Sequence, residues 1–198
     1  MSKIAKTSVT INQLLANRWS PRAFSKKDIS DESLLKMFEA ARWAPSASNI
    51  QPWQFILGKK SDATYQKIFE TLVEFNQMWA KNAPVLILNC ADTTREDGTI
   101  NETSGYDLGQ AVAHFSIQAM SENIFVHQMS GFSKEKAVEL FKLPENMEPI
   151  SVMSIGYLGV SEMLHPRMQV SEKAERERKP LNEMLFQNEL GEASDLIK

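Results

Sequence analysis

Cysteine is almost absent from this sequence of 198 residues, in which Cys90 is the single example. No disulfide can form within the chain, and a reducing compartment fits best. Cys90 stands in the most apolar segment, where no cationic neighbour would lower the pKa of its thiol. We therefore expect it to fill space in the core.

Clusters of metal ligands are missing as well. His114, His127 and His165 are scattered along the chain, and none has a cysteine or a carboxylate at the spacing of a zinc site. The sequence predicts no metal site.

The chain also has neither an excess of positive charge nor a long apolar run. Its 22 Lys and Arg residues against 25 Asp and Glu residues give a formal net charge of −3, which does not favour nucleic acid as a partner. No stretch approaches the roughly 20 apolar residues that span a bilayer, and residues 1–13 resemble no signal peptide. We expect a cytoplasmic protein with a packed core and no membrane partner.

Common nucleotide and nucleophile motifs are absent too. There is no Gly-x-Gly-x-x-Gly after a predicted strand and no phosphate-binding glycine loop with lysine, so a dinucleotide would have to bind in another way. Ser-x-x-Lys occurs at Ser33 and again at Ser133, without the companion motifs that an acylating serine enzyme needs. We interpret both as chance matches.

Hydrophobic periodicity predicts interleaved helices and strands. Thr10 and Gln13 have capping-box spacing, Ser30 is a candidate N-cap, and Asn123 is suited to a left-handed helix end. The strand at 84–90 is apolar on both faces, which is typical of the centre of a covered sheet. Helices are expected at residues 10–17, 31–44, 62–75, 104–122 and 133–143, and strands at 53–57, 84–90, 124–128 and 150–157.

This alternation predicts one domain over residues 1–198, and by itself it favours an α/β arrangement with a parallel sheet. From Gly159 onward the sequence resembles a loop, with a charge run at 172–179 and an apolar patch at 181–186. Such a tail has little core of its own and must dock elsewhere.

Three polar segments remain as candidate chemistry. Residues 18–22, Arg-Trp-Ser-Pro-Arg, offer two guanidinium groups that could bind phosphate or simply form a solvated turn. Residues 45–53, Pro-Ser-Ala-Ser-Asn-Ile-Gln-Pro-Trp, form a ridge stiffened by prolines at 45 and 52. Residues 175–181, Glu-Arg-Glu-Arg-Lys-Pro-Leu, would alone be a solvated charge run.

Together these segments, with Gly131-Phe132 between the last two, resemble the nitroreductase family of flavin enzymes in order and spacing. The resemblance implies an α+β nitroreductase fold with a central, mostly antiparallel sheet flanked by helices. It also implies a homodimer with one FMN per subunit at the interface. The C-terminal tail, about residues 160–198, would be exchanged between the subunits. On fold class we follow the resemblance.

The resemblance also implies the site. Arg18, Arg176 and Arg178 would hold the FMN phosphate, with Ser20 near the ribityl chain. Arg22 would be the catalytic residue, near N1 and O2, where negative charge accumulates on reduction. Asn76 would read the pyrimidine edge. The cofactor-binding set is Arg18, Trp19, Ser20, Arg22, Pro45, Ser46, Ala47, Ser48, Asn49, Asn76, Gln128, Ser130, Gly131, Arg176 and Arg178.

Within that set, residues 45–49 would come from the opposite subunit, and the segment at 128–131 would face N5 and O4. Two features depart from the family's pattern. Ser121-Glu122-Asn123 stands where many members have glycines, and Pro21 and His127 occupy variable positions.

The implied activity is hydride transfer from NADH or NADPH through flavin N5 to a nitroaromatic, quinone or flavin acceptor in a ping-pong cycle. The alternatives are an oxygen-using flavin enzyme, a non-turnover FMN-binding or redox-sensing module, and a flavin-free dimeric binding protein. No 2′-phosphate reader is recognisable, so the preference between NADH and NADPH stays open.

Overall fold

The computed structural model describes residues 3–197, and an antiparallel sheet lies at its centre. The strands are β1 (Trp53–Lys59), β2 (Val85–Asp92), β3 (Phe125–Met129) and β4 (Met147–Gly156), in the order β1-β2-β4-β3. All three pairings are antiparallel, which confirms the α+β fold class.

The parallel sheet that alternation alone suggested is wrong. Lys59 at the end of β1 faces Val85 at the start of β2, so the intervening chain starts and finishes at the same end of the sheet. The connection contains two consecutive helices, α3 (Ala63–Thr71) and α4 (Glu74–Ala80). A parallel pair would instead need a crossover that carries the chain from one end of the sheet to the other. Hydrophobic periodicity does not reveal at which end of a sheet a connection finishes.

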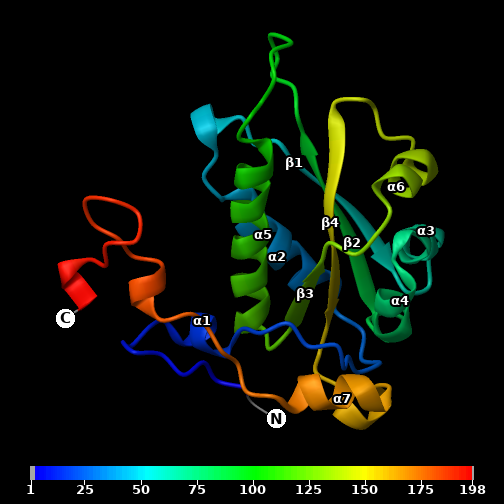
Figure 1. Cartoon of the computed structure of the whole chain (residues 1–198). Helices are drawn as coiled ribbons and strands as arrows, with labels where there is room; N and C mark the ends of the chain where they lie inside the picture. The colour runs from blue at the N-terminus through cyan, green and yellow to red at the C-terminus, as the bar shows by residue number, and fades with distance from the viewer. Residues whose placement is uncertain (1–2, 198) are drawn as a thin grey trace.

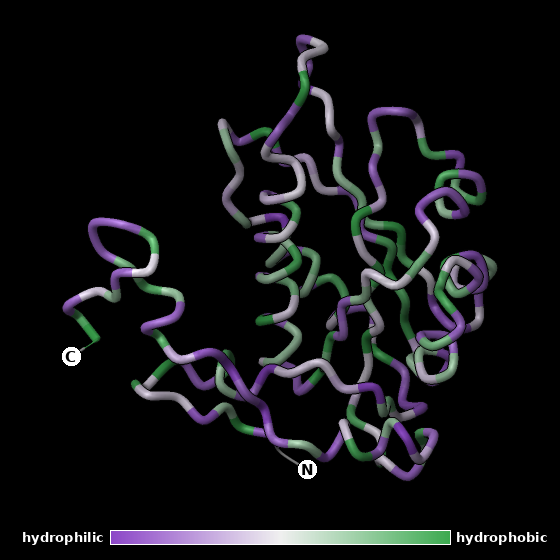
Figure 2. The backbone as a smooth tube through the Cα atoms, in the orientation of Figure 1, coloured by the Kyte–Doolittle hydropathy of each residue, from purple (hydrophilic) through white to green (hydrophobic). Residues whose placement is uncertain are grey.

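Helices cover both faces of the sheet (Figure 1). The face with α2 (Asp31–Arg42) and α5 (Ser104–Ser121) buries Ile87 of β2, and the opposite face, with α3, buries Leu86. Seven of the eight residues of β2 are buried, which confirms its predicted central position. Hydrophobic residues accordingly gather along the inner strands in Figure 2. None of the helices within residues 3–197 is long and apolar enough to cross a membrane.

Local signals at helix ends are confirmed in two of three cases. Ser30 Oγ accepts a hydrogen bond from the Ser33 amide at the start of α2, and Asn123 follows α5 with a φ of 56°. The capping box at Thr10 and Gln13 is wrong. The first helix, α1, spans Gln13–Asn17 and is capped by Asn12, whose side chain reaches the Leu14 amide.

The helix expected at residues 62–75 is also wrong, because it divides into α3 and α4. Leu72 is extended and pairs with Phe132, and the Val73 amide donates to the Gly131 carbonyl at 3.1 Å. The chain thus leaves the helix to form hydrogen bonds with the segment that follows β3. Periodicity within one segment cannot detect such a partner.

The region after Gly159 is only partly loop-like. It contains α7 (Pro166–Lys173), which begins with Pro166 in its first turn and His165 as its cap, whereas we expected no helix there. The predicted helix after Ser133 is present as α6 (Lys134–Phe141). Short 3₁₀ turns complete the secondary structure: η1 (Ala47–Asn49), η2 (Ser161–Met163), η3 (Leu181–Glu183) and η4 (Asp195–Ile197).

Beyond α7 the chain forms an arm that projects from the body (Figure 1). Its internal contacts include a bridge between Phe186 and Ala193. Leu190 and Leu196 are 89% and 87% exposed, so the arm leaves its apolar side chains uncovered.

Cys90 is buried in β2, and its burial raises the pKa of the thiol to about 12. We predict that native protein does not react with Ellman's reagent at about pH 8, because thiolate is the reactive form. One thiol per chain should react after unfolding in guanidinium chloride. Rapid labelling of native protein would contradict this placement.

Candidate functional site

The candidate site begins with the loop between α1 and Phe24. Trp19 is buried and sets the edge of its ring against Phe125 of β3, with the ring centroids 6.1 Å apart. Pro21 is buried, and its carbonyl lies 2.9 Å from His127 Nδ1. Phe24 forms a bridge with Leu158, just after β4. The loop is therefore held against the β3–β4 edge of the sheet.

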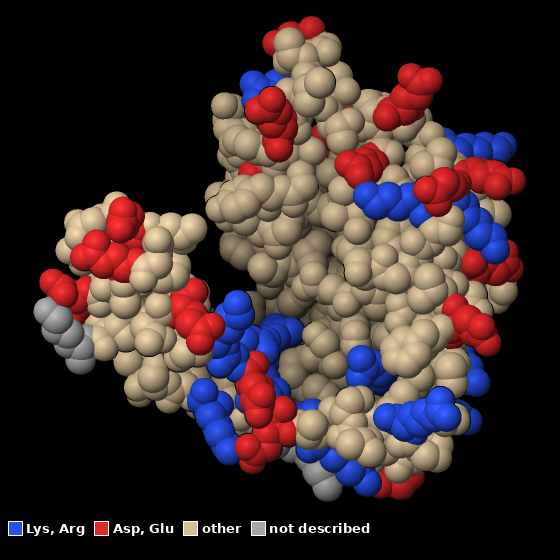
Figure 3. Space-filling view, in the orientation of Figure 1, with Lys and Arg blue, Asp and Glu red and all other residues tan. Residues whose placement is uncertain are grey.

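Three arginines from the two ends of the chain lie close together. Burial and then the charge of Arg178 lower the pKa of the Arg18 guanidinium. Burial and then the charges of Arg18 and Arg178 lower the pKa of Arg176. Figure 3 shows basic side chains gathered at one end of a hollow in the molecular surface. The structure thus brings together the predicted phosphate ligands from residues 18 and 176–178.

Hydrogen bonds to neutral groups hold these arginines. Arg176 Nη1 donates to the carbonyls of Lys3 and Ala16, at 2.9 and 2.7 Å, and Arg18 Nη1 lies 3.3 Å from Ser20 Oγ. Arg178 Nη1 donates to the Glu177 carbonyl at 2.7 Å. Because carbonyl and hydroxyl groups do not neutralise charge, the cluster is suited to an anion.

Arg22 is half-buried and differs from the other arginines in its surroundings. Its Nη1 lies 3.3 Å from Ser171 Oγ, and its guanidinium carbon is 5.8 Å from the centre of the Phe75 ring. Its Nε is buried and has no hydrogen-bond partner among residues 3–197. Arg22 therefore has donor capacity left for a further acceptor.

A second group of predicted residues lies where α4 meets the end of β3. Asn76 Nδ2 donates to the Gly131 carbonyl at 2.9 Å, and a Cβ on Gly131 would lie 2.7 Å from that nitrogen. Gln128 and Ser130, just before Gly131, are exposed. Because Phe75 precedes Asn76 on α4, this group lies on the same side of the molecule as Arg22.

The ridge at residues 45–49 lies elsewhere in the chain. It borders the start of α5, where the Ala47 amide donates to Asp107 Oδ2 at 3.2 Å. The loop at residues 18–23, here called the arginine loop, lies toward the opposite end of α5 (Figure 1). An 18-residue helix is about 27 Å long. One chain therefore does not bring the ridge to the arginines, and its contact with a flavin of another subunit stays a prediction.

The ridge is nevertheless built unusually. Ser48, Asn49 and Gln51 have φ values of 50°, 58° and 55°, a region that non-glycine residues seldom occupy. The Gln51 amide donates to Ser46 Oγ at 3.0 Å, which helps to hold this backbone. Backbone strain that the surroundings maintain is a frequent mark of a binding segment.

Sequence reasoning missed four residues of the site: Phe75, His127, Ser171 and Glu172. His127 had been set aside as a scattered histidine, and the last two had no visible role because α7 was not expected. The Glu172 carboxylate is buried and accepts hydrogen bonds from the Arg22 and Ala23 amides. Within residues 3–197 no three His, Cys, Asp or Glu side chains are grouped as metal ligands.

Comparisons with known proteins agree with this geometry. The family model "Nitroreductase family" matches residues 15–77. An Archaeoglobus fulgidus protein named "Putative NADH dehydrogenase/NAD(P)H nitroreductase" is 32% identical over 149 residues, which cover 73% of this chain and 83% of that protein. The chain belongs to the nitroreductase family.

Solved structures give the same result. One described as "the oxidoreductase containing FMN" is 32% identical, with a TM-score of 0.89, and the match covers 96% of this chain and 97% of that one. A nitroreductase family protein from Clostridium difficile is 25% identical, with a TM-score of 0.70 and coverages of 89% and 97%. Nitroreductase-family membership accounts for the order of the predicted motifs along the chain.

His127 supports the arginine loop as an uncharged ring. Its Nδ1 donates to the Pro21 carbonyl, and its ring centroid lies 4.4 Å from that of Trp79. Burial is the main cause that lowers its pKa to about 4, and the charges of Arg22 and Arg18 add to the effect. The imidazole is therefore neutral at neutral pH.

We predict a loss of stability when the pH falls from about 6.5 to about 4. In that window the unfolded chain binds a proton at His127 and the folded chain does not. Protonation of His127 in the unfolded chain should lower the free energy of unfolding by on the order of 3 kcal/mol across this window. Urea unfolding at several pH values should show a flatter pH dependence for His127→Asn than for the unchanged protein. The exposed His114, changed to Asn, is the control, and an unchanged slope in His127→Asn would contradict the assignment.

Proposed function

We propose that this nitroreductase-family chain is an FMN-dependent oxidoreductase. It would take hydride from NADH or NADPH and pass the electrons to a nitroaromatic, quinone or flavin acceptor in a ping-pong cycle. The observation that carries this proposal is the cluster of Arg18, Arg176 and Arg178 beside Arg22. The FMN-containing relative and the names of the NAD(P)H oxidoreductase homologues also support it.

The residues present fit FMN at its two charged regions. A phosphate dianion matches the clustered guanidinium groups of Arg18, Arg176 and Arg178, whose mutual repulsion it would relieve. The partnerless Nε of Arg22 suits an acceptor at the pyrimidine end of the ring. Asn76 and the backbone at Ser130 and Gly131 would contact the same ring system. Trp19 would support the arginine loop through its packing against Phe125.

When bound, FMN supplies two-electron chemistry by accepting a hydride at N5 and later giving both electrons to the acceptor. The chain's own contribution is binding, orientation and charge. Arg22 would place a positive charge where negative charge develops on the reduced cofactor, and such stabilisation by a fixed group lowers the barrier. Glu172, a buried acid beside Arg22, accepts hydrogen bonds from two backbone amides, and solvent would supply the protons.

We further propose that the working unit is a cytoplasmic homodimer. The arm after α7 exposes Leu185, Leu190 and Leu196, which a second subunit could cover. The ridge, with Pro45, Ser46, Ala47, Ser48 and Asn49, would then reach the FMN of that subunit. A dimer would therefore cover the exposed leucines of the arm and bring the ridge to a flavin.

Arg178→Gln tests the phosphate cluster. Loss of a charged hydrogen bond to phosphate should weaken FMN affinity about tenfold or more, measured by fluorescence quenching as FMN is added to apoprotein. Arg42→Gln on α2, where Arg42 pairs with Glu39, is the control and should bind FMN normally. Equal affinities for all three proteins would contradict the cluster as a phosphate site.

Arg22→Ala tests the redox role. We expect this variant to bind FMN but to be reduced by NADH or NADPH on the order of 100-fold more slowly, because the group that stabilises the developing charge is gone. Stopped-flow absorbance of the bound flavin measures the rate, and Arg22→Lys should recover part of it. Reduction of Arg22→Ala at the unchanged rate would refute the role. A flavin that stays yellow with excess NADH and NADPH in the unchanged protein would favour the sensor alternative.

A further inference from the structure

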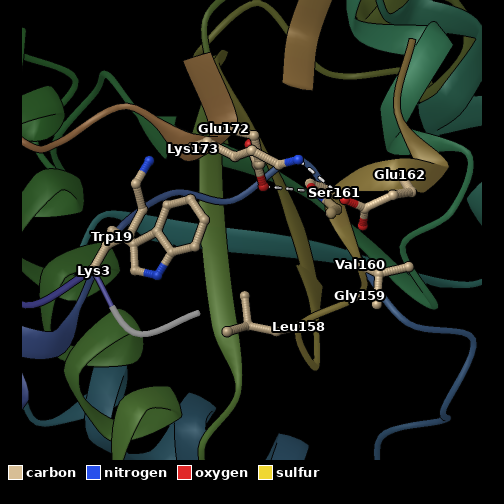
Figure 4. A pocket seen from close by; sticks show the side chains of 10 residues that line it. Lys3, Trp19, Leu158, Gly159, Val160, Ser161, Glu162, Glu172 and Lys173 are labelled. Atoms are coloured by element: carbon tan, nitrogen blue, oxygen red, sulfur yellow. Dashed lines mark hydrogen bonds and ion pairs between the residues drawn. The ribbon is translucent and has the colours of Figure 1, made fainter. Parts of the chain in front are cut away.

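Glu172 joins the last helix to the arginine loop. It lies near the end of α7, is 7% exposed, and forms part of the wall of a cavity of about 250 Å³ that Trp19 and Leu158 also line (Figure 4). Burying a carboxylate is costly unless hydrogen bonds or opposite charges compensate. The contacts of Glu172 therefore indicate what this burial achieves.

The Glu172 carboxylate binds two successive backbone amides. The Arg22 amide lies 2.9 Å from Oε1 and 3.2 Å from Oε2, and the Ala23 amide lies 3.0 Å from Oε1. The Ala23 carbonyl accepts from Gly159 instead, at 2.8 Å. Glu172 thus satisfies two amides that the sheet does not use, and it fixes the backbone at Arg22.

The neighbouring residue on α7 holds the other end of Arg22. Ser171 Oγ lies 3.3 Å from Arg22 Nη1, and its hydroxyl donates to the Met168 carbonyl, which leaves its lone pairs free for the arginine. Two adjacent residues therefore determine where the Arg22 guanidinium lies, one through the backbone and one through the side chain.

Glu172 also places negative charge among cations. Burial is the main cause that lowers the pKa of Lys3, and the nearby Arg176 and Arg22 lower it further, whereas Glu172 raises it. The carboxylate therefore offsets part of the repulsion among the basic groups around the loop.

We propose that Glu172 is a positioning residue for Arg22. By binding the Arg22 and Ala23 amides, it holds the guanidinium in the place from which it acts on the cofactor. The inference rests on the proposed function. His127 anchors the preceding residue, Pro21, so loss of Glu172 should disturb Arg22 more than the phosphate ligands at Arg18 and Ser20.

Amide hydrogen exchange of the apoprotein tests the contact without the cofactor. Glu172→Gln removes the charge that strengthens both hydrogen bonds and turns one acceptor oxygen into a donor, so the amides of Arg22 and Ala23 should exchange about tenfold faster or more. Glu162→Gln is the matched control, because Glu162 lines the same cavity and pairs with Lys173. Unchanged exchange at both amides in Glu172→Gln would overturn the proposal.

A double-mutant cycle tests whether Glu172 acts through Arg22. Glu172→Gln should slow flavin reduction at least about fivefold and shift the midpoint potential, with FMN affinity changed less than about threefold. In an Arg22→Ala background the same change should alter the rate less than about twofold. Equal losses in both backgrounds would show a merely structural role and overturn the proposal.

A second variant and the reduction of the unchanged holoprotein separate failure of the positioning role from failure of the proposed function. If Glu172→Gln melts too low for kinetics, Glu172→Asp keeps the charge with a shorter reach and should show the same dependence on Arg22. If the unchanged holoprotein is not reduced by either nicotinamide, the proposed function fails. A holoprotein that is reduced normally, with no coupling between Glu172 and Arg22, overturns the positioning role alone.

Discussion

Repulsion among cations is the constraint on which the candidate site depends. Arg18 and Arg176 come from opposite ends of the chain. After burial, the charge of Arg178 contributes to lowering the pKa of both guanidinium groups. Folding brings these charges together and holds them with carbonyl and hydroxyl groups. Like charges held close cost free energy that an anion would return on binding. Part of the affinity of this cluster for an anion would therefore come from relief of the repulsion that folding imposes.

The sheet supplies the rigidity that such a cluster needs. β2 and β4 lie at its centre, and helices cover both faces. The arginine loop is held to the edge strand β3 by the His127 ring, and the end of β3 is held to α4 by the hydrogen bond from Asn76 to Gly131. The loop that carries Arg18 and Arg22 is thus anchored to a strand of the central sheet, which limits how far the charges can move apart.

The sequence predicted those helix ends that depend on contacts between residues close together in the chain. Ser30 caps a helix and Asn123 adopts the left-handed conformation because each satisfies helix-end amides or carbonyls within a few residues. The break after α3 depends on Gly131, about 60 residues away in sequence. The role of Glu172 depends on amides 150 residues away. The motifs of the family marked the arginines, but residues that support them through backbone contacts leave no pattern.

The ridge holds three non-glycine residues in a strained backbone conformation. Each non-glycine residue in the left-handed region costs on the order of 1 kcal/mol, and Ser48, Asn49 and Gln51 occupy it within four positions. Within the chain this backbone is held by contacts that include Asp107 and Ser46, far from the arginines. A segment with no ligand of its own would gain nothing from this strain. The cost becomes understandable if the ridge is shaped in advance for a surface that another subunit presents, since a preformed loop loses little entropy when it binds.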